Sequence, residues 1–320
     1  MKRIVLIFWC TLTLAGAAEL PEVDKKAVEL WQRGNEFQQK KSLSRAKAEY
    51  QKALRISPRY LDALYNLAVV SEQLGENTEA IDSYKKYLEI RPNDADVWNQ
   101  LGVRYDEADK KAEAQAAYEK ALAIDPKFGL AHHNLGVMMK EQGKLDIAQK
   151  HFEQFVQLEE AAGRQTGDAY YSLGALLLQR GRVKDAKLLI QKALDTDPTT
   201  SYYNNAMGDV YLASSEKELA LSAYRRALEK DAKYAPAYSG LGDAYRLAGD
   251  REKAAEAYRK ALELRADYSL VHYKLGLLWE KTQPAEAIKS FEKYLTSAKN
   301  PEFQNEAKAK IEQLKQAKTE

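Results

Sequence analysis

The sequence predicts an all-α protein, a solenoid of about eight similar helix pairs. A pattern of small and aromatic residues returns about every 34 residues through most of the chain, and the apolar residues inside each period follow helical spacing. The composition, 45% hydrophobic and 30% charged, is that of a folded chain. Each repeat of such an array contacts only its neighbours, so a chain of 320 residues needs no single large core.

Residues 98–126 show the repeated pattern most completely. Gly102 and Ala114 are small, so two helices can approach closely, and Tyr118 fills the space between them. Pro126 cannot continue a helix and therefore sets the turn into the next repeat. An apolar stripe runs along the first helix at Trp98, Leu101 and Tyr105.

This spacing resembles the tetratricopeptide repeat family, whose unit is a helix–turn–helix of about 34 residues. When Gly102 is numbered position eight, the same grid fits residues 27–298. Position eight is glycine except at Ala68, position twenty is alanine, and position twenty-four is a large residue. The resemblance implies a right-handed superhelical solenoid whose first helices line a concave groove. The predicted repeats are 27–60, 61–94, 95–128, 129–166, 167–200, 201–234, 235–268 and 269–298.

Two departures from the period predict local changes. Gly136 and Gly174 are 174 − 136 = 38 residues apart, four more than the period. We therefore expect the second helix of repeat four to be one turn longer and to end at Gly163. The last repeat is one residue short near Pro284, which predicts a tighter turn between its helices. The glycines expected to end helices in the left-handed conformation are Gly75, Gly143, Gly181 and Gly249.

Residues 299–320 are predicted to form a capping helix and a short tail. Asn300 is a favoured helix cap, and Pro301 suits the first helical position. A terminal helix of this kind covers the docking face that the last repeat would otherwise expose. Its apolar stripe is Phe303, Ala307, Ile311 and Leu314.

Residues 1–18 are predicted to be a secretory signal peptide, and residues 19–26 a linker. Two basic residues precede a short apolar run, and small residues follow it, so we expect cleavage after Ala17 or Ala18. The protein would then lie in the periplasm or outside the cell, with no stable membrane insertion after cleavage. The alternative is an inner-membrane anchor through an uncleaved leader, although the run is shorter than the ~20 residues of a spanning helix.

Charge and composition narrow the classes of function. Without Lys2 and Arg3 the chain has 49 − 2 = 47 basic residues against 47 acidic ones, which argues against nucleic acid as a partner. The single cysteine, Cys10, lies in the leader, so we expect no disulfide in the mature chain. No phosphate loop, metal-binding pattern or nucleophile motif is present. We therefore predict no enzyme activity, no catalytic residues, no metal and no cofactor.

The candidate binding surface is the set of first-helix positions two, five, six, nine, twelve and thirteen, which point away from the helix-pair core. In repeats one to three these positions hold five acids and no base, which predicts a ligand with a basic segment. Position six carries a row of side-chain amides that could hold a peptide backbone. Later repeats are more apolar there and then mildly basic. The predicted peptide-binding residues are Gln32, Asp62, Asn66, Asp96, Asn99, Gln100, Asp106, Asn134, Tyr171 and Tyr202.

The leading hypothesis is a non-catalytic scaffold or adaptor that binds a protein or peptide in the concave groove. The alternative is a periplasmic holdase-like chaperone for non-native or assembling envelope proteins, in which the apolar later repeats would hold clients with little sequence preference. Terminal repeats of such arrays can also self-associate, so homo-oligomerisation stays open.

Overall fold

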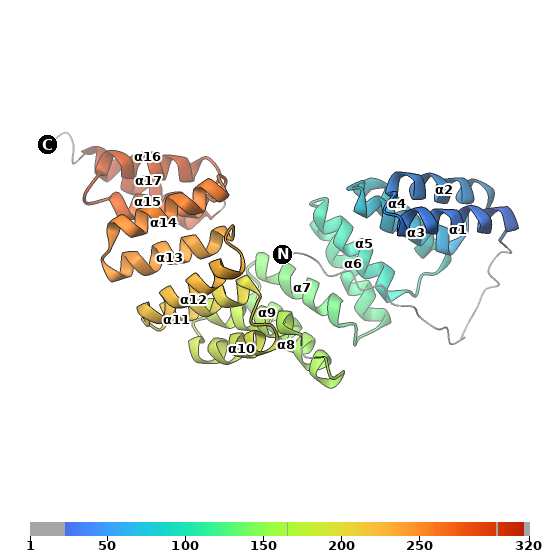
Figure 1. The fold of residues 1–320 in the computed structure, drawn as a ribbon, viewed down its shortest axis with the longest axis horizontal. Helices are drawn as coiled ribbons and strands as arrows, with labels where there is room; N and C mark the ends of the chain where they lie inside the picture. Colours follow the sequence, from blue (N-terminus) through green and yellow to red (C-terminus); the bar gives the residue numbers. More distant parts are fainter. Residues whose placement is uncertain (1–22, 165, 299, 317–320) are drawn as a thin grey trace. The chain divides into compact units, whose positions relative to one another are not determined.

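A computed structural model describes residues 23–164, 166–298 and 300–316 of the chain, and these residues form seventeen helices (Figure 1). The predicted leader and most of the predicted linker lie outside the described residues. The helices are α1 (Lys25–Gln39), α2 (Leu43–Ile56), α3 (Leu61–Gln73), α4 (Asn77–Ile90), α5 (Ala95–Glu107), α6 (Lys111–Ile124), α7 (Gly129–Glu141), α8 (Leu145–Ala161), α9 (Gly167–Gln179), α10 (Val183–Thr196), α11 (Ser201–Ala213), α12 (Lys217–Lys230), α13 (Ala235–Ala248), α14 (Arg251–Leu264), α15 (Ser269–Trp279), α16 (Pro284–Leu295) and α17 (Pro301–Gln316).

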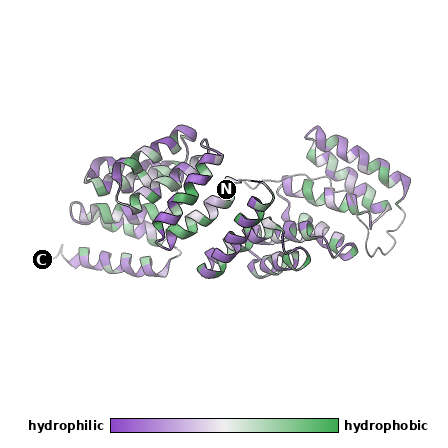
Figure 2. Ribbon diagram, turned by 90° about the horizontal axis from the view of Figure 1, so that it is seen from below, coloured by the Kyte–Doolittle hydropathy of each residue, from purple (hydrophilic) through white to green (hydrophobic). Residues whose placement is uncertain are grey.

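The chain divides into two compact units, residues 1–131 and 132–320, which we call the N-terminal unit and the C-terminal unit. In both units consecutive helices pack as antiparallel neighbours along the chain, α1 with α2 and α13 with α14 for example. Every helix carries both hydrophobic and hydrophilic residues, as Figure 2 shows, which is the pattern expected when one face is buried and the other meets water. The all-α solenoid of helix pairs is therefore confirmed.

Six of the eight helix pairs are closed by an aromatic ring that lies on a glycine, whereas Ile190 lies on Gly174 in repeat five and repeat two has Ala68 in place of the glycine. A Cβ atom added at Gly208 would lie 2.5 Å from a ring carbon of Tyr224, and one added at Gly242 would lie 2.4 Å from Tyr258. Such distances are too short for any side chain at position eight without a shift of the ring. The same contact joins Gly34 to Tyr50, Gly102 to Tyr118, Gly136 to Phe152 and Gly276 to Phe291.

In seven of the eight repeats the turn between the paired helices has position fifteen in the left-handed conformation, whereas in the last repeat this position is Gln283 with φ of −141°. The predicted glycines adopt it, with φ between +73° and +86° at Gly75, Gly143, Gly181 and Gly249. The same position is occupied by residues other than glycine in three further repeats, where φ is 56° at Lys41, 58° at Asp109 and 62° at Ser215. These three repeats therefore share the turn geometry although they lack the glycine from which it could be predicted.

Of the two departures from the period, the longer helix of repeat four has the structural form that was predicted. Helix α8 has 17 residues, whereas α6 and α10 have 14, and Gly163 follows it with φ of +68°. In the last repeat the missing residue is lost from the first helix, because α15 has 11 residues whereas α11 has 13. Residues 280–283 separate α15 from Pro284, which begins α16, and this connection is longer than residues 74–76 between α3 and α4, so the prediction of a tighter turn is wrong.

Both ends of the array are capped by polar side chains. Helix α1 begins at Lys25, before the predicted start of the first repeat at residue 27, because the Asp24 carboxylate accepts a hydrogen bond from the Lys26 backbone N–H. Asn300 Oδ1 accepts from the backbone N–H groups of Glu302 and Phe303, at 2.9 and 3.3 Å, and begins α17. The apolar side of α17 is buried against α16, so α17 is the predicted capping helix.

A substitution at the glycine contact should loosen one repeat first. We expect Gly208→Val to lower the free energy of unfolding by about 1–3 kcal/mol, because the added methyl groups must displace the Tyr224 ring. Hydrogen exchange should show protection lost first in α11 and α12, since repeats couple mainly to their neighbours. Leu188→Ala, at a side chain 67% exposed, is the control. A uniform loss of protection over the whole unit would contradict this.

At position fifteen, the left-handed position, a substitution to glycine should stabilise the protein. Lys41→Gly should raise the stability of the N-terminal unit by about 0.5–1 kcal/mol, because glycine removes the steric cost of φ at 56°. Gly75→Ala, at φ of +76°, should lower it. Chemical denaturation of the three proteins measures both changes, and a gain from Gly75→Ala would refute the steric explanation.

Candidate functional site

The first helices of neighbouring pairs lie against one another. Helix α1 contacts α3, α9 contacts α11, and α11 contacts α13, whereas in the part of the chain that the structure describes the second helices of these pairs make no contacts of similar extent with one another. Within each unit the first helices therefore form the inner row of the stack. We call the surface made by their positions two, five, six, nine, twelve and thirteen the inner face.

Hydroxyl groups from the core reach this inner face. The position-twenty-four tyrosine passes over the position-eight glycine, so its hydroxyl emerges beside position nine or twelve. Tyr50 donates to Asn35 Oδ1 at 2.7 Å, and Tyr84 donates to Glu72 Oε1 at 2.9 Å. The ring that closes each helix pair thus also orients a polar side chain on the binding surface.

The row of amides is partly engaged inside the protein. Asn66 Nδ2 donates to Asn35 Oδ1 of the preceding repeat at 2.9 Å. Gln32 is exposed, while Gln100 and Asn134 are partly exposed. Asn134 belongs to the C-terminal unit, so the four predicted amides are divided between the two units.

The acids of the N-terminal unit are less available than their number suggested. Arg104 Nε lies 3.3 Å from Glu72, and Arg104 Nη1 lies 2.6 Å from Glu107. Lys111 Nζ lies 2.7 Å from Asp106. Arg104 and Lys111 lie at repeat positions outside the predicted binding surface, so a count of acids and bases at the predicted positions did not include them. The prediction of an acidic face without bases is corrected accordingly, and Asp106 is part of an ion pair.

Asp62 and Asp96 differ from the other three acids. Among the described residues, no lysine or arginine nitrogen lies within 4 Å of either carboxylate. Asp62 is exposed and Asp96 is partly exposed. Burial raises the pKa of Asp96 to about 6, and the neighbouring Asp94 carboxylate adds to the rise. Asn99 is only 3% exposed, so the prediction that its side chain offers an open contact is wrong.

The predicted tyrosines of the C-terminal unit form a cluster around a carboxylate. The ring centroids of Tyr171 and Tyr202 are 4.9 Å apart, and those of Tyr202 and Tyr203 are 4.6 Å apart. Tyr202 and Tyr203 both donate their hydroxyls to Asp168 Oδ1, the latter at 2.8 Å. This part of the surface was predicted to be apolar, and it is instead an aromatic surface with a charged group.

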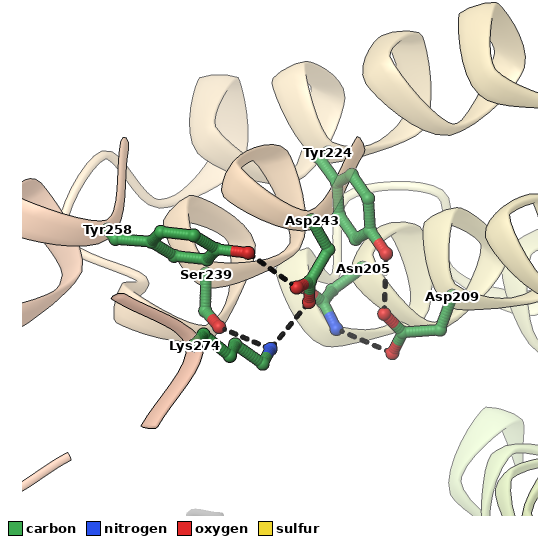
Figure 3. A network of polar contacts seen from close by, with 7 residues as sticks. All are labelled: Asn205, Asp209, Tyr224, Ser239, Asp243, Tyr258 and Lys274. Atoms are coloured by element: carbon green, nitrogen blue, oxygen red, sulfur yellow. Dashed lines mark hydrogen bonds and ion pairs between the residues drawn. The ribbon is translucent and has the colours of Figure 1, made fainter. Parts of the chain in front are cut away.

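A polar network continues from α11 to α15 (Figure 3). Asp209 accepts hydrogen bonds from Tyr224 Oη at 2.6 Å and from Asn205 Nδ2 at 3.1 Å. One repeat later Asp243 accepts from Tyr258 Oη at 2.7 Å and forms an ion pair with Lys274. Lys274 was predicted to make this end of the groove basic, but its charge is matched by Asp243.

Asp209 and Asp243 were absent from the predicted set. Both stand at position nine of their repeats, where the first repeat has Asn35, so the grid that selected the other residues already contained them. Burial raises the pKa of Asp209 to about 6, with opposing contributions from the Tyr224 hydrogen bond and from Lys274. Burial, and the adjacent Asp209 carboxylate, also raise the pKa of Tyr224 well above its usual range.

Two neighbouring histidines of α7 have polar partners on the helices that follow. His132 Nδ1 lies 3.0 Å from His151 Nδ1, and His133 Nε2 lies 3.2 Å from Ser172 Oγ. Within the residues that the structure describes, no group of three or more histidine, cysteine, aspartate or glutamate side chains is placed to hold a metal ion. In the same residues no helix combines the length and apolar character needed to span a bilayer.

The raised pKa of Asp209 predicts a pH-dependent stability. The folded state binds this proton more tightly than the unfolded state, whose pKa is near 3.8, so the contribution of Asp209 to stability falls as pH rises from about 4 to about 7. The free energy of unfolding of Asp209→Asn should not show this fall, so relative to that of the wild type it should rise by about 1–3 kcal/mol between about pH 4 and about pH 7. Urea unfolding at about pH 4 and at about pH 7 measures the free energy of unfolding of both proteins. Asp82→Asn, at an exposed carboxylate, is the control, and parallel curves for Asp209→Asn and wild type would contradict the prediction.

Comparisons with known proteins agree with the fold. Family models described as tetratricopeptide repeat match residues 32–95, 95–128, 117–150 and 140–200, and a TPR repeat model matches residues 242–283. The type IV pilus assembly protein PilF of Pseudomonas aeruginosa is 39% identical over 59 residues, which are 18% of this chain. The matched region spans 23% of the length of that relative.

Solved structures show the same architecture at low sequence identity. A tetratricopeptide repeat protein from Parabacteroides merdae has a TM-score of 0.65 at 18% identity, covering 80% of this chain and 99% of its own. The structure titled APC/C hetero-tetramer Cut9-Hcn1 has a TM-score of 0.64 at 22% identity, covering 85% of this chain and 52% of its own. Yeast Tom70 has a TM-score of 0.56 at 18% identity, covering 95% of this chain and 67% of its own. At these identities the likeness establishes the fold alone.

Proposed function

Because the chain belongs to the tetratricopeptide repeat family, we propose that it is a non-catalytic scaffold or adaptor that binds a polypeptide on its inner face. The observation that carries the proposal is the repeated delivery of core tyrosine hydroxyls to polar side chains of that face, at Asn35, Glu72, Asp209 and Asp243. A packed core holds these groups in place, so little conformational entropy is lost when a ligand binds them.

In the N-terminal unit the ligand presents a basic segment to α3 and α5. Asp62 and Asp96 supply the negative charge, since the other acids of this face have intramolecular ion pairs. Gln32, Asn66 and Gln100 supply amide donors and acceptors for the backbone of an extended peptide. Asn66 keeps its bond to Asn35 and still offers its carbonyl oxygen.

We propose that this binding takes place outside the cytoplasm, in the periplasm or the surrounding medium, because residues 1–18 have the pattern of a secretory signal peptide. The likeness to a pilus assembly protein supports a role in bringing envelope or surface-assembly proteins together. A cross-linked pull-down from the native envelope fraction tests the adaptor function, which requires one or a few partners in stoichiometric amounts.

A holdase-like chaperone is the second candidate, favoured by apolar side chains on the first helices of the C-terminal unit. Leu247 is 41% exposed, and Leu178 and Leu212 are partly exposed. A holdase suppresses the aggregation of unrelated denatured proteins with little sequence preference, whereas an adaptor does not. Light scattering of two unrelated denatured clients separates the two functions.

Charge reversal tests the basic-segment proposal. We expect Asp62→Lys combined with Asp96→Lys to remove the cognate partner from the pull-down and to weaken its affinity at least about tenfold, because attraction becomes repulsion at two sites. Asp82→Lys combined with Glu89→Lys changes the net charge equally on exposed positions of α4 and should leave binding intact. Equal recovery by both double variants would remove the acidic-face proposal.

A further inference from the structure

Three carboxylates on the inner face of the C-terminal unit differ in their partners. Asp168, Asp209 and Asp243 lie on α9, α11 and α13. Lys274 forms its ion pair with Asp243, and among the described residues no ion pair forms on Asp168 or Asp209. Those two carboxylates accept hydrogen bonds from tyrosine hydroxyls and, at Asp209, from the amide of Asn205.

Aromatic rings lie between these two carboxylates. Tyr171 packs edge-on against Tyr202, at 4.9 Å between centroids and 74° between planes, and Tyr202 in turn donates to Asp168. Tyr171 and Tyr202 are both partly exposed, so their rings are accessible to a ligand. The negative faces of the two rings add to the field of the carboxylates.

A second observation points to a ligand rich in hydrogen-bond donors. Asn205 donates to Asp209 through Nδ2, which leaves its carbonyl oxygen as an acceptor. This Oδ1 atom is buried and receives no hydrogen bond from the described residues. Figure 3 shows Asn205 beside Asp209, to which its Nδ2 atom donates.

We infer that this surface, Asp168, Tyr171, Tyr202, Asn205 and Asp209, is a subsite for an arginine side chain of the bound polypeptide. The inference rests on the proposed function, because it assumes a polypeptide on the inner face. Arginine fits better than lysine, since its planar guanidinium stacks on an aromatic ring and carries five donors. The aliphatic part of its side chain covers the exposed edge of the tyrosines.

The subsite differs from the basic-segment surface in its chemistry. Asp62 and Asp96 offer charge on an open helical face, whereas here aromatic rings flank the carboxylates and core hydroxyls orient them. The C-terminal subsite therefore discriminates the shape of the cation as well as its sign.

Fluorescence anisotropy of the full chain with four labelled peptides tests the inference. The peptides share the sequence Gly-Phe-Xaa-Phe-Gly, where Xaa is arginine, lysine, citrulline or glutamate. Citrulline keeps the size and planarity of arginine without its charge. We expect the arginine peptide to bind at least about tenfold tighter than the citrulline peptide, with lysine between them and glutamate weakest.

Variants locate the binding. Asp168→Asn and Asp209→Asn should each reduce the preference for arginine over citrulline at least about threefold, and Tyr171→Leu should reduce the preference for arginine over lysine. Asp82→Asn, at an exposed carboxylate of α4 outside both proposed binding surfaces, is the matched control and should change neither ratio. Circular dichroism verifies that each variant is folded, and Asp168→Asn, at a partly exposed position, serves if Asp209→Asn does not fold.

Two outcomes would overturn the subsite. One is equal affinity for the arginine and citrulline peptides, including the absence of binding by either. The other is an arginine preference that the Asp168 and Asp209 variants leave unchanged, which would place the cation elsewhere on the chain. In both cases the adaptor function is tested separately, by the pull-down of a stoichiometric partner.

Discussion

The contact between the position-eight glycine and the position-twenty-four ring is the constraint on which the rest of the structure depends. At Gly208 and Gly242 the ring lies where a Cβ would otherwise be, so the two helices of a pair approach as closely as their backbones allow. Close packing of this kind leaves few voids and gives each pair one defined geometry. Because the pair is the unit of the array, the geometry of this single contact is repeated along the chain.

The same contact determines the chemistry of the inner face. A phenylalanine would close a helix pair as well as a tyrosine does, and Phe152 and Phe291 do so. Where the ring is tyrosine, its hydroxyl emerges on the inner row and binds an acid or amide, as at Asp209 and Asp243. Packing and the arrangement of polar groups are therefore two results of one side chain, and they change together from repeat to repeat.

Charge on the inner face is controlled by residues from neighbouring helices. Arg104 approaches Glu72 from the next first helix, and Lys274 approaches Asp243 in the same manner. Partly buried carboxylates without such a partner, Asp96 and Asp209, have raised pKa values because burial disfavours their ionised form. A cationic group from a ligand would restore the interaction that these two carboxylates lack.

The sequence by itself determined the repeat, the helix pairs and the longer second helix of repeat four. These depend on short-range spacing, and residues such as Gly163 and Asn300 act within one turn of their own helix. Only the tertiary structure decided which acids are neutralised and which position-nine residues join the site, because ion pairs such as Arg104 with Glu72 join side chains a repeat apart in the chain. Helical periodicity assigns each residue to a face, but it carries no information on which long side chain reaches across from the next helix.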